Sequence, residues 1–167
     1  KSYLDEIRSH YWLEDRSKDL LHLAKYQGEP MYLDAFRLSK AELNGIVSAN
    51  TVIVPVPLSL EKFLSRTYNQ AWIIGSWIAK ATGRPLVCDG LLKSSDTNSQ
   101  AKLSKTERTR NLKGSFEWNL RCEKPASVLL VDDVMTTGAT LEECAKTLKK
   151  SGIKMVSAWT LFRTPKI

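Results

Sequence analysis

Cysteine is scarce in this 167-residue sequence, and the three present, Cys88, Cys122 and Cys144, form no Cys-x-x-Cys pair. Zinc sites use such short spacings, and an odd, scattered set of cysteines does not make a disulfide framework. We therefore expect reduced thiols, as is usual for a cytoplasmic protein.

Long apolar runs are also missing, because no stretch approaches the roughly 20 residues that a membrane-spanning helix needs. The first six residues, Lys1-Ser-Tyr-Leu-Asp-Glu6, lack the apolar region of a signal peptide. The sequence begins with Lys rather than Met, as a piece of a longer chain would. With 43% hydrophobic and 26% charged residues it has enough apolar side chains for one folded domain in the cytoplasm, without a membrane span.

Acidic residues are fewer than basic ones, and the formal net charge is +7. Residues 91–113 carry six Lys or Arg against two acids, and residues 144–167 carry six against none. A basic surface attracts phosphate groups, whether on a small ligand or on a nucleic acid. Lysine-rich helix faces are also common for solubility alone, so the charge leaves both interpretations open.

Helical periodicity alternates with short apolar runs, which predicts an α/β fold. Helices are expected at residues 12–26, about 31–43, 68–81 and 141–150, and strands at 51–57, 86–88, 127–131 and 155–161. The final strand–turn–helix–strand series predicts two parallel neighbouring strands, with Thr140 and Glu143 at the spacing of a capping box. We divide the chain into an N-terminal helical segment, 1–50, packed on a core domain, 51–167. Trp72 and Trp77 are expected to pack in the core rather than to stack on bases.

Two aspartates, Asp132 and Asp133, follow the most apolar predicted strand directly. Ligands of open α/β sheets bind beyond the carboxyl ends of the strands. Two carboxylates at that place can accept hydrogen bonds from a diol, such as the hydroxyls of a ribose, or help to hold a magnesium ion.

The following residues, Thr136-Thr-Gly-Ala-Thr140, supply hydroxyls, backbone N–H groups and a glycine just before a predicted helix. The N-terminus of a helix is a favourable place for an anion. The acids and this loop together predict a sugar phosphate as ligand. P-loop nucleotidases also have an acidic strand end, but no G-x-x-x-x-G-K-[ST] motif occurs here. A merely solvated strand end is the other alternative.

Val131-Asp-Asp-Val-Met-Thr-Thr-Gly-Ala-Thr140 matches the phosphoribosyl pyrophosphate motif of type I phosphoribosyltransferases. Further motifs resemble, in order, the pattern of the ComF family: Lys25-Tyr26, Val54-Pro-Val-Pro-Leu-Ser59, Arg66-Thr-Tyr-Asn-Gln70, Thr97-x-x-Gln100, Leu103-Ser104, Glu107-Arg108, Asn111 and Gly114-x-Phe116. The resemblance extends from about Leu20 to Arg163. It implies a type I phosphoribosyltransferase-like fold, with a mostly parallel central sheet between helices. It also implies a role in natural transformation, in which incoming single-stranded DNA is handled.

The resemblance further implies the ligand, phosphoribosyl pyrophosphate with magnesium, and a role for each matching residue. Asp132 and Asp133 would hold the ribose hydroxyls and the magnesium side. The 5-phosphate would lie on Met135, Thr136, Thr137, Gly138, Ala139 and Thr140, and the pyrophosphate on Pro57, Leu58, Ser59 and Arg66. Two departures from the family pattern are Thr67, where the family usually has Gly, and the missing four-cysteine zinc module, so that zinc is not expected.

A long polar, basic stretch runs from Lys93 to Lys113 without sustained periodicity. Long polar loops inside compact domains are usually functional. We expect a flexible flap that brings Lys102, Lys105 and Arg108 over the ligand.

The resemblance leaves the activity open, because fold does not determine function. One alternative is an enzyme that transfers the phosphoribosyl group to an unidentified acceptor. Another is a binding module that uses the ligand for regulation while a basic surface, including Lys146, Lys149 and Lys150, engages single-stranded DNA. A phosphoribosyltransferase of nucleotide metabolism is a third. The sequence gives no indication of the oligomeric state.

Overall fold

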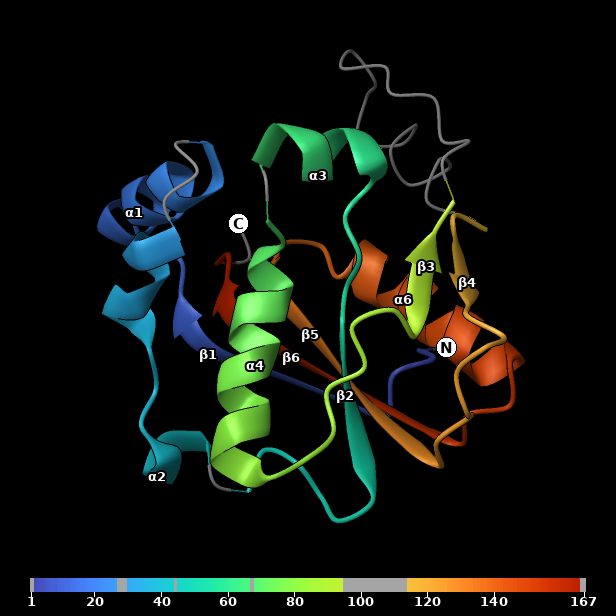
Figure 1. The fold of residues 1–167 in the computed structure, drawn as a ribbon. Coiled ribbons are helices and arrows are strands. Elements are labelled where there is room, and N and C mark those ends of the chain that lie inside the picture. The colour runs from blue at the N-terminus through green and yellow to red at the C-terminus, as the bar shows by residue number, and fades with distance from the viewer. Residues whose placement is uncertain (1, 27–29, 44, 67, 95–113, 166–167) are drawn as a thin grey trace.

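The centre of the protein is a four-stranded parallel sheet, seen in a computed structural model that describes residues 2–26, 30–43, 45–66, 68–94 and 114–165. The strand order is β1-β6-β5-β2 (Figure 1). The strands are β1 (Glu6–Trp12), β2 (Thr51–Pro55), β5 (Ser127–Met135) and β6 (Met155–Arg163). The predicted parallel pairing of the last two is confirmed, with Val128 opposite Val156 and Val131 opposite Trp159.

Helices cover both faces of this sheet, which is why its two inner strands are apolar on both sides. On one face lie α1 (Asp15–Tyr26), the 3-10 helix η1 (Pro30–Phe36), α2 (Lys40–Leu43) and α4 (Gln70–Thr82). On the other lie α6 (Ala139–Lys150) and the small antiparallel pair of β3 (Leu91–Lys93) with β4 (Phe116–Trp118). Successive residues of β5 alternate between these layers: Leu130 packs with Leu141 and Leu148, and Leu129 with Ile74.

The sequence predicts a helical N-terminal segment, but the structure shows that this segment also contains a strand. Residues 6–12 form strand β1 at the edge of the central sheet, parallel to β6, and the following helix begins at Asp15 rather than Trp12. Strand β1 has a neighbour on one side only, and its sequence, Glu-Ile-Arg-Ser-His-Tyr-Trp, lacks a buried apolar run. The expected helix at 31–43 is divided into η1 and the short α2.

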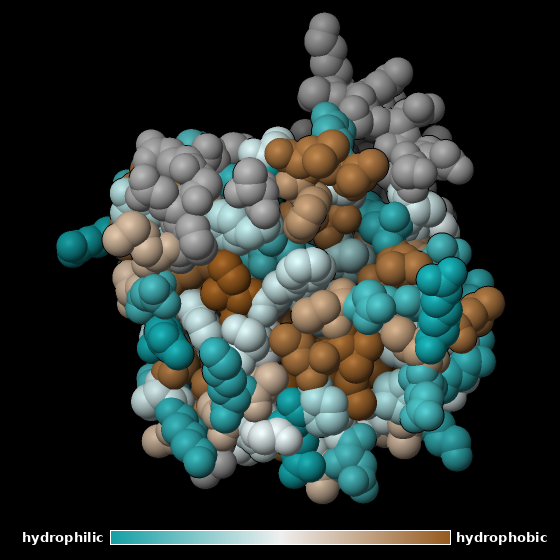
Figure 2. Space-filling model, in the orientation of Figure 1, coloured by the Kyte–Doolittle hydropathy of each residue, from teal (hydrophilic) through white to brown (hydrophobic). Residues whose placement is uncertain are grey.

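Two smaller predictions also need correction. Residues 86–88 form no regular strand; only Leu86 makes an isolated bridge, with Ile53. An additional helix, α3 (Leu60–Arg66), lies between β2 and α4, beyond the carboxyl end of β2 (Figure 1). Its Leu60 and Leu64 side chains are exposed. Figure 2 shows an apolar, brown area over this helix at the top of the molecule. Among the described residues, no helix is long and apolar enough to cross a membrane.

The tryptophan prediction is confirmed for one residue of two. Trp77 of α4 is buried, with 9% of its surface exposed, whereas Trp72 is 39% exposed and lies against Phe63 of α3, ring centroids 5.9 Å apart.

Candidate functional site

The acidic pair lies at the carboxyl edge of the sheet, as expected, but inside a longer strand than predicted. Strand β5 continues to Met135, paired with β6 as far as Arg163, whereas β2 ends opposite Val131. Asp132 and Asp133 therefore extend beyond the end of β2 while β6 still supports their backbone. This stepped edge exposes one side of β5 to a ligand.

The two carboxyl groups have different surroundings, because neighbouring strand residues face opposite layers. Asp133 follows Leu129 and Val131 toward the α1 and α4 layer, and only 8% of its surface is exposed. Asp132 follows Val128 and Leu130 toward the layer of α6 and β3, and is partly exposed.

Asp133 forms an ion pair with Lys25 of α1, the Nζ atom lying 2.6 Å from Oδ2. Both side chains are largely covered, at 20% exposure for Lys25 and 12% for Asp133. Among the described residues, Oδ2 has no further hydrogen-bond donor. Because a buried carboxylate is costly without a compensating charge, Lys25 is what stabilises Asp133 in its ionised form.

The surroundings of Asp132 favour its protonated form. Burial of its carboxyl group and then the nearby charge of Asp133 raise the pKa of Asp132 well above its usual range, to about 8. The Asp133 N–H, which donates to Asp132 Oδ1 at 2.8 Å, and the charge of Lys25 work against this rise. The site therefore combines a carboxyl group that is paired with a lysine and one that is easily protonated.

A second lysine, Lys93 of β3, lies within electrostatic range of Asp132. Burial, and then the charge of Lys62 in α3, lower the pKa of Lys93, whereas Asp132 acts to raise it. Lys25 of α1 and Lys93 of β3 thus approach the acidic pair from two different elements, and Lys62 of α3 acts on Lys93. This positive surrounding suits a ligand that carries several negative charges.

The predicted phosphate loop joins β5 to α6, and the N-cap residue of the helix differs from the one that the sequence predicts. Gly138 is the N-cap residue, with φ 80°, so the helix starts at Ala139. The Ala139 N–H donates to Thr137 Oγ1 at 3.3 Å, and the side chains of Thr136 and Thr137 are exposed.

The expected capping box of Thr140 and Glu143 is wrong. Thr140 lies inside the first turn of α6, because Gly138 already occupies the cap position. Glu143 instead accepts from the Gly114 N–H at 2.9 Å and from Lys146 Nζ at 3.2 Å. The first turn of α6 still leaves N–H groups without partners within the helix, next to the hydroxyls of the loop.

The loop after β2, predicted to face the pyrophosphate, is held from both sides. The Val56 N–H donates to the Val131 carbonyl at 2.8 Å. Asn69, only 3% exposed, donates through Nδ2 to the Val56 carbonyl at 2.9 Å and accepts through Oδ1 from the Ala71 N–H at 2.9 Å. Asn69 is thus both the N-cap of α4 and a brace for the backbone that leads into Pro57.

Pro57, Leu58 and Ser59 are partly buried between this brace and α3. Ser59 lies at the start of α3, where its backbone carbonyl accepts from the Phe63 N–H at 2.9 Å. Arg66, the last residue of α3, is half-buried, and its charge acts on Tyr68. Thr67 and the predicted flap residues Lys102, Lys105 and Arg108 lie outside the described residues.

A cavity of about 360 Å³ opens beside Asp133, between α1 and the end of β5. It joins apolar and cationic side chains with the start of the phosphate loop: Leu13, Lys18, Leu21, His22, Lys25, Asp133, Val134 and Thr136. The Tyr68 hydroxyl donates to the Ala24 carbonyl and so fixes α1 against the connection before α4.

The structure therefore brings the acidic pair, the loop at 136–140 and the loop at 57–59 to one edge of the sheet. Analysis of the sequence missed the role of Lys25, which entered only as part of a family motif, and that of Lys93, which was assigned to the loop. A lysine in the last turn of a helix is ordinarily explained by the helix dipole, so the signal of Lys25 was not specific.

The donor set is suitable for magnesium, which prefers carboxylate and phosphate oxygens and keeps several waters. No group of three or more His, Cys, Asp or Glu side chains suited to a metal ion occurs in the described part of the chain. A magnesium ion here would thus take most of its ligands from a phosphorylated ligand and from water.

The chain is similar in sequence to a known domain and to known proteins. The phosphoribosyl transferase domain model matches residues 85–166. The competence protein ComFC of Bacillus subtilis is 30% identical over 164 residues, and competence protein F of Haemophilus influenzae is 31% identical over 160. These alignments cover 96% and 95% of this chain, but only 65% and 64% of the two relatives. The chain is a ComF-family protein.

The fold is that of type I phosphoribosyltransferases. Glutamine phosphoribosylpyrophosphate amidotransferase from B. subtilis, solved with ADP and GMP, superposes with a TM-score of 0.50 over 83% of this ComF-family chain and 30% of its own. The sequence identity is 19%, so this similarity concerns the fold alone. The predicted fold class is thereby confirmed, and the predicted family is confirmed by the competence-protein relatives.

Proposed function

We propose that this chain binds phosphoribosyl pyrophosphate together with magnesium at the carboxyl edge of the sheet, in a protein that takes part in DNA uptake. The observation that carries the proposal is the position of Asp132 and Asp133 beside a helix N-terminus that begins at a left-handed glycine, Gly138. A diol acceptor next to an anion site is what a ribose 5-phosphate requires. The names of the competence-protein relatives support the role in DNA uptake.

Each part of the ligand has a matching group in this proposal. The ionised Asp133 accepts a hydrogen bond from a ribose hydroxyl, and Asp132 contributes a second oxygen or, when protonated, a donor. The N–H groups and hydroxyls at 136–140 receive the 5-phosphate. Arg66 and the loop at 57–59 face the pyrophosphate, whose developing charge on departure a guanidinium would stabilise. Magnesium would supply charge neutralisation of the pyrophosphate.

A thermal-shift titration with phosphoribosyl pyrophosphate and magnesium tests this assignment. Asp132→Asn combined with Asp133→Asn should abolish the ligand-induced rise in Tm. A matched control, Asp19→Asn with Glu123→Gln, removes two exposed acids elsewhere and should keep the full rise. An undiminished rise in the first variant would contradict the site.

Phosphoribosyl transfer is the second candidate function, and the 360 Å³ cavity between α1 and Asp133 favours it, because an acceptor could approach the ribose there. Pyrophosphate released on addition of a candidate acceptor would establish transfer. Ligand binding without turnover would instead favour a regulatory binding module.

Binding of single-stranded DNA is also part of the proposal. The ion pairs of the predicted lysines affect which of them are available to bind DNA phosphates. Lys146 is paired with Glu143, and Lys149 lies 2.7 Å from Asp5 and 2.6 Å from the Lys154 carbonyl. These two lysines already have acidic partners, so they are less available to phosphates than expected from the sequence. Lys150, the third predicted lysine, is exposed and forms no ion pair within the described residues, so it is the most available of the three to a phosphate.

A further inference from the structure

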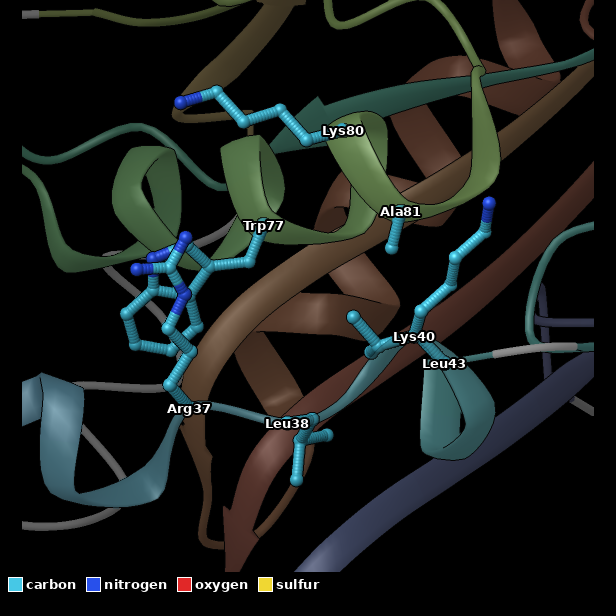
Figure 3. Close-up of a pocket in the computed structure, with 7 residues that line it drawn as sticks. All are labelled: Arg37, Leu38, Lys40, Leu43, Trp77, Lys80 and Ala81. Atoms are coloured by element: carbon cyan, nitrogen blue, oxygen red, sulfur yellow. The ribbon is translucent and has the colours of Figure 1, made fainter.

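A second cavity, of about 220 Å³, lies at the other end of α4 from the acidic pair. Helix α4 begins at Asn69, which is bonded to Val56 at the carboxyl end of β2, and the cavity adjoins its last turn. Figure 3 shows the lining side chains, which come from the connection between η1 and α2, from α2 and from α4: Arg37, Leu38, Lys40, Leu43, Trp77, Lys80 and Ala81.

The lining contains three cations and no acid. Arg37, Lys40 and Lys80 are all exposed, and none of them forms an ion pair within the described residues. By contrast, Lys18, Lys25, Lys146 and Lys149 each have a carboxylate partner. Three unpaired cations around one cavity repel one another, and a bound anion would remove that repulsion.

The nearest acid in sequence, Glu42 of α2, is engaged elsewhere. Its Oε2 accepts from the Ser39 N–H at 2.8 Å and from the Ser39 hydroxyl at 2.7 Å, and its Oε1 lies 3.8 Å from His10. Glu42 therefore forms no ion pair with Arg37, Lys40 or Lys80 in the described part of the chain.

Arg37 is held in position by an aromatic ring. Its guanidinium carbon lies 6.0 Å from the centroid of the Trp77 ring, and the two side chains lie together in Figure 3. Trp77 is buried, so it supports the guanidinium rather than offering a free face to a base. A guanidinium fixed on a ring keeps its N–H edge for an oxyanion, and less side-chain entropy is lost on binding.

We infer that this cavity is a second phosphate site, which binds the phosphate group of a nucleotide. Phosphate carries more oxygens and more negative charge than a carboxylate, and so suits a cavity whose charged lining residues are all cationic. The apolar floor of Leu38, Leu43 and Ala81 suits the sugar that carries the phosphate. The site is remote from the acidic pair and does not depend on binding of phosphoribosyl pyrophosphate, whereas binding of a strand phosphate here rests on the proposed role with single-stranded DNA.

The phosphate can belong to a free nucleotide or to an internal position of a single strand. Both have the same chemistry at this cavity. Thymidine monophosphate and a twelve-residue oligothymidylate serve as the two probes, and a six-residue polyglutamate serves as an acidic peptide.

The test compares two doubly substituted proteins that lose the same charge. Arg37→Gln with Lys40→Gln removes two of the three cavity cations. Arg121→Gln with Lys124→Gln removes two exposed cations from the connection between β4 and β5. Lys80 is left unchanged, because its position in the last turn of α4 also stabilises the helix. Equal unfolding transitions of the two proteins show that the fold is intact.

The readout is the NMR resonance of the Trp77 indole N–H, assigned by its loss in Trp77→Phe. Phosphate bound at residues 136–140 lies at the opposite end of α4, so this resonance reports binding at the cavity rather than at that loop. The cavity variant should weaken binding of the nucleotide, the oligomer or both by about tenfold or more relative to the control variant, as expected for loss of charge-assisted contacts. An effect on the monophosphate alone identifies free nucleotides as the source. An effect on the oligomer alone identifies strand phosphates.

Equal affinities of the two variants for both phosphate probes would overturn the proposal, and so would a Trp77 resonance that does not move. A loss restricted to polyglutamate would also overturn it, in favour of an acidic protein partner.

Discussion

Lys25 Nζ lies 2.6 Å from Asp133 Oδ2 and so connects the N-terminal helix α1 to the carboxyl end of β5. The pair is the link between the first 50 residues and the proposed ligand site. A ribose hydroxyl that reaches Asp133 has to share the carboxylate with this lysine. We therefore expect Lys25 to affect both the stability of the protein and its affinity for the ligand.

Lys25→Met should lower the free energy of unfolding by about 2–3 kcal/mol, because Asp133 would keep a mostly buried charge without its partner. Lys18→Met is the control on the same helix. It breaks the exposed ion pair between Lys18 Nζ and Asp15 Oδ1, which lie 2.8 Å apart, and should cost much less than Lys25→Met. Urea denaturation at pH 7 measures both. Adding Asp133→Asn to Lys25→Met should restore most of the loss, and equal costs for the two lysine variants would contradict the pairing.

Asp132 predicts a pH dependence of stability. Its folded pKa, about 8, lies above the unfolded value of 3.8, so the folded protein binds the proton more tightly. The stabilisation is complete below pH 4 and is lost as the pH rises toward 8. Asp132→Asn should remove this dependence of the free energy of unfolding on pH. From pH 5 to pH 8 the variant should therefore become increasingly stable relative to the wild type. Asp19→Asn, at an exposed site, should leave the slope unchanged.

Gly138 provides a test of the phosphate loop. Its φ of 80° is unfavourable for a residue with a side chain, and alanine there should cost about 1–2 kcal/mol. An added Cβ would meet only Met135 Sδ, at 3.7 Å, so the cost comes from the backbone. Gly45 has the same φ and open space, and Gly45→Ala is the matched control. Both should lower Tm, but only Gly138→Ala should weaken binding of phosphoribosyl pyrophosphate in calorimetry.

Elements that depend on a pattern within one continuous stretch of the sequence could be predicted. Strand β5, the acids behind it and the parallel partner β6 follow from two apolar runs around an amphipathic helix. Strand β1 was missed because an edge strand with charged residues needs no apolar run. The capping box failed because the left-handed backbone of Gly138 begins α6 two residues before Thr140. The Lys25–Asp133 pair joins distant parts of the chain, and only the folded structure brings them together.

Asn69 allows the two roles of the brace to be separated. Asn69→Asp keeps an oxygen that can accept the Ala71 N–H, but it loses the donor to the Val56 carbonyl. Asn69→Ala loses both contacts at a buried position and should cost about 1–2 kcal/mol in urea denaturation. Helix α4 should therefore remain capped in the aspartate variant only. If the brace positions residues 57–59 for the pyrophosphate, both variants should bind phosphoribosyl pyrophosphate more weakly. Affinity for ribose 5-phosphate, which lacks the pyrophosphate, should be unchanged in both. An equal loss for the two ligands would mean that Asn69 acts on the whole fold rather than on this loop.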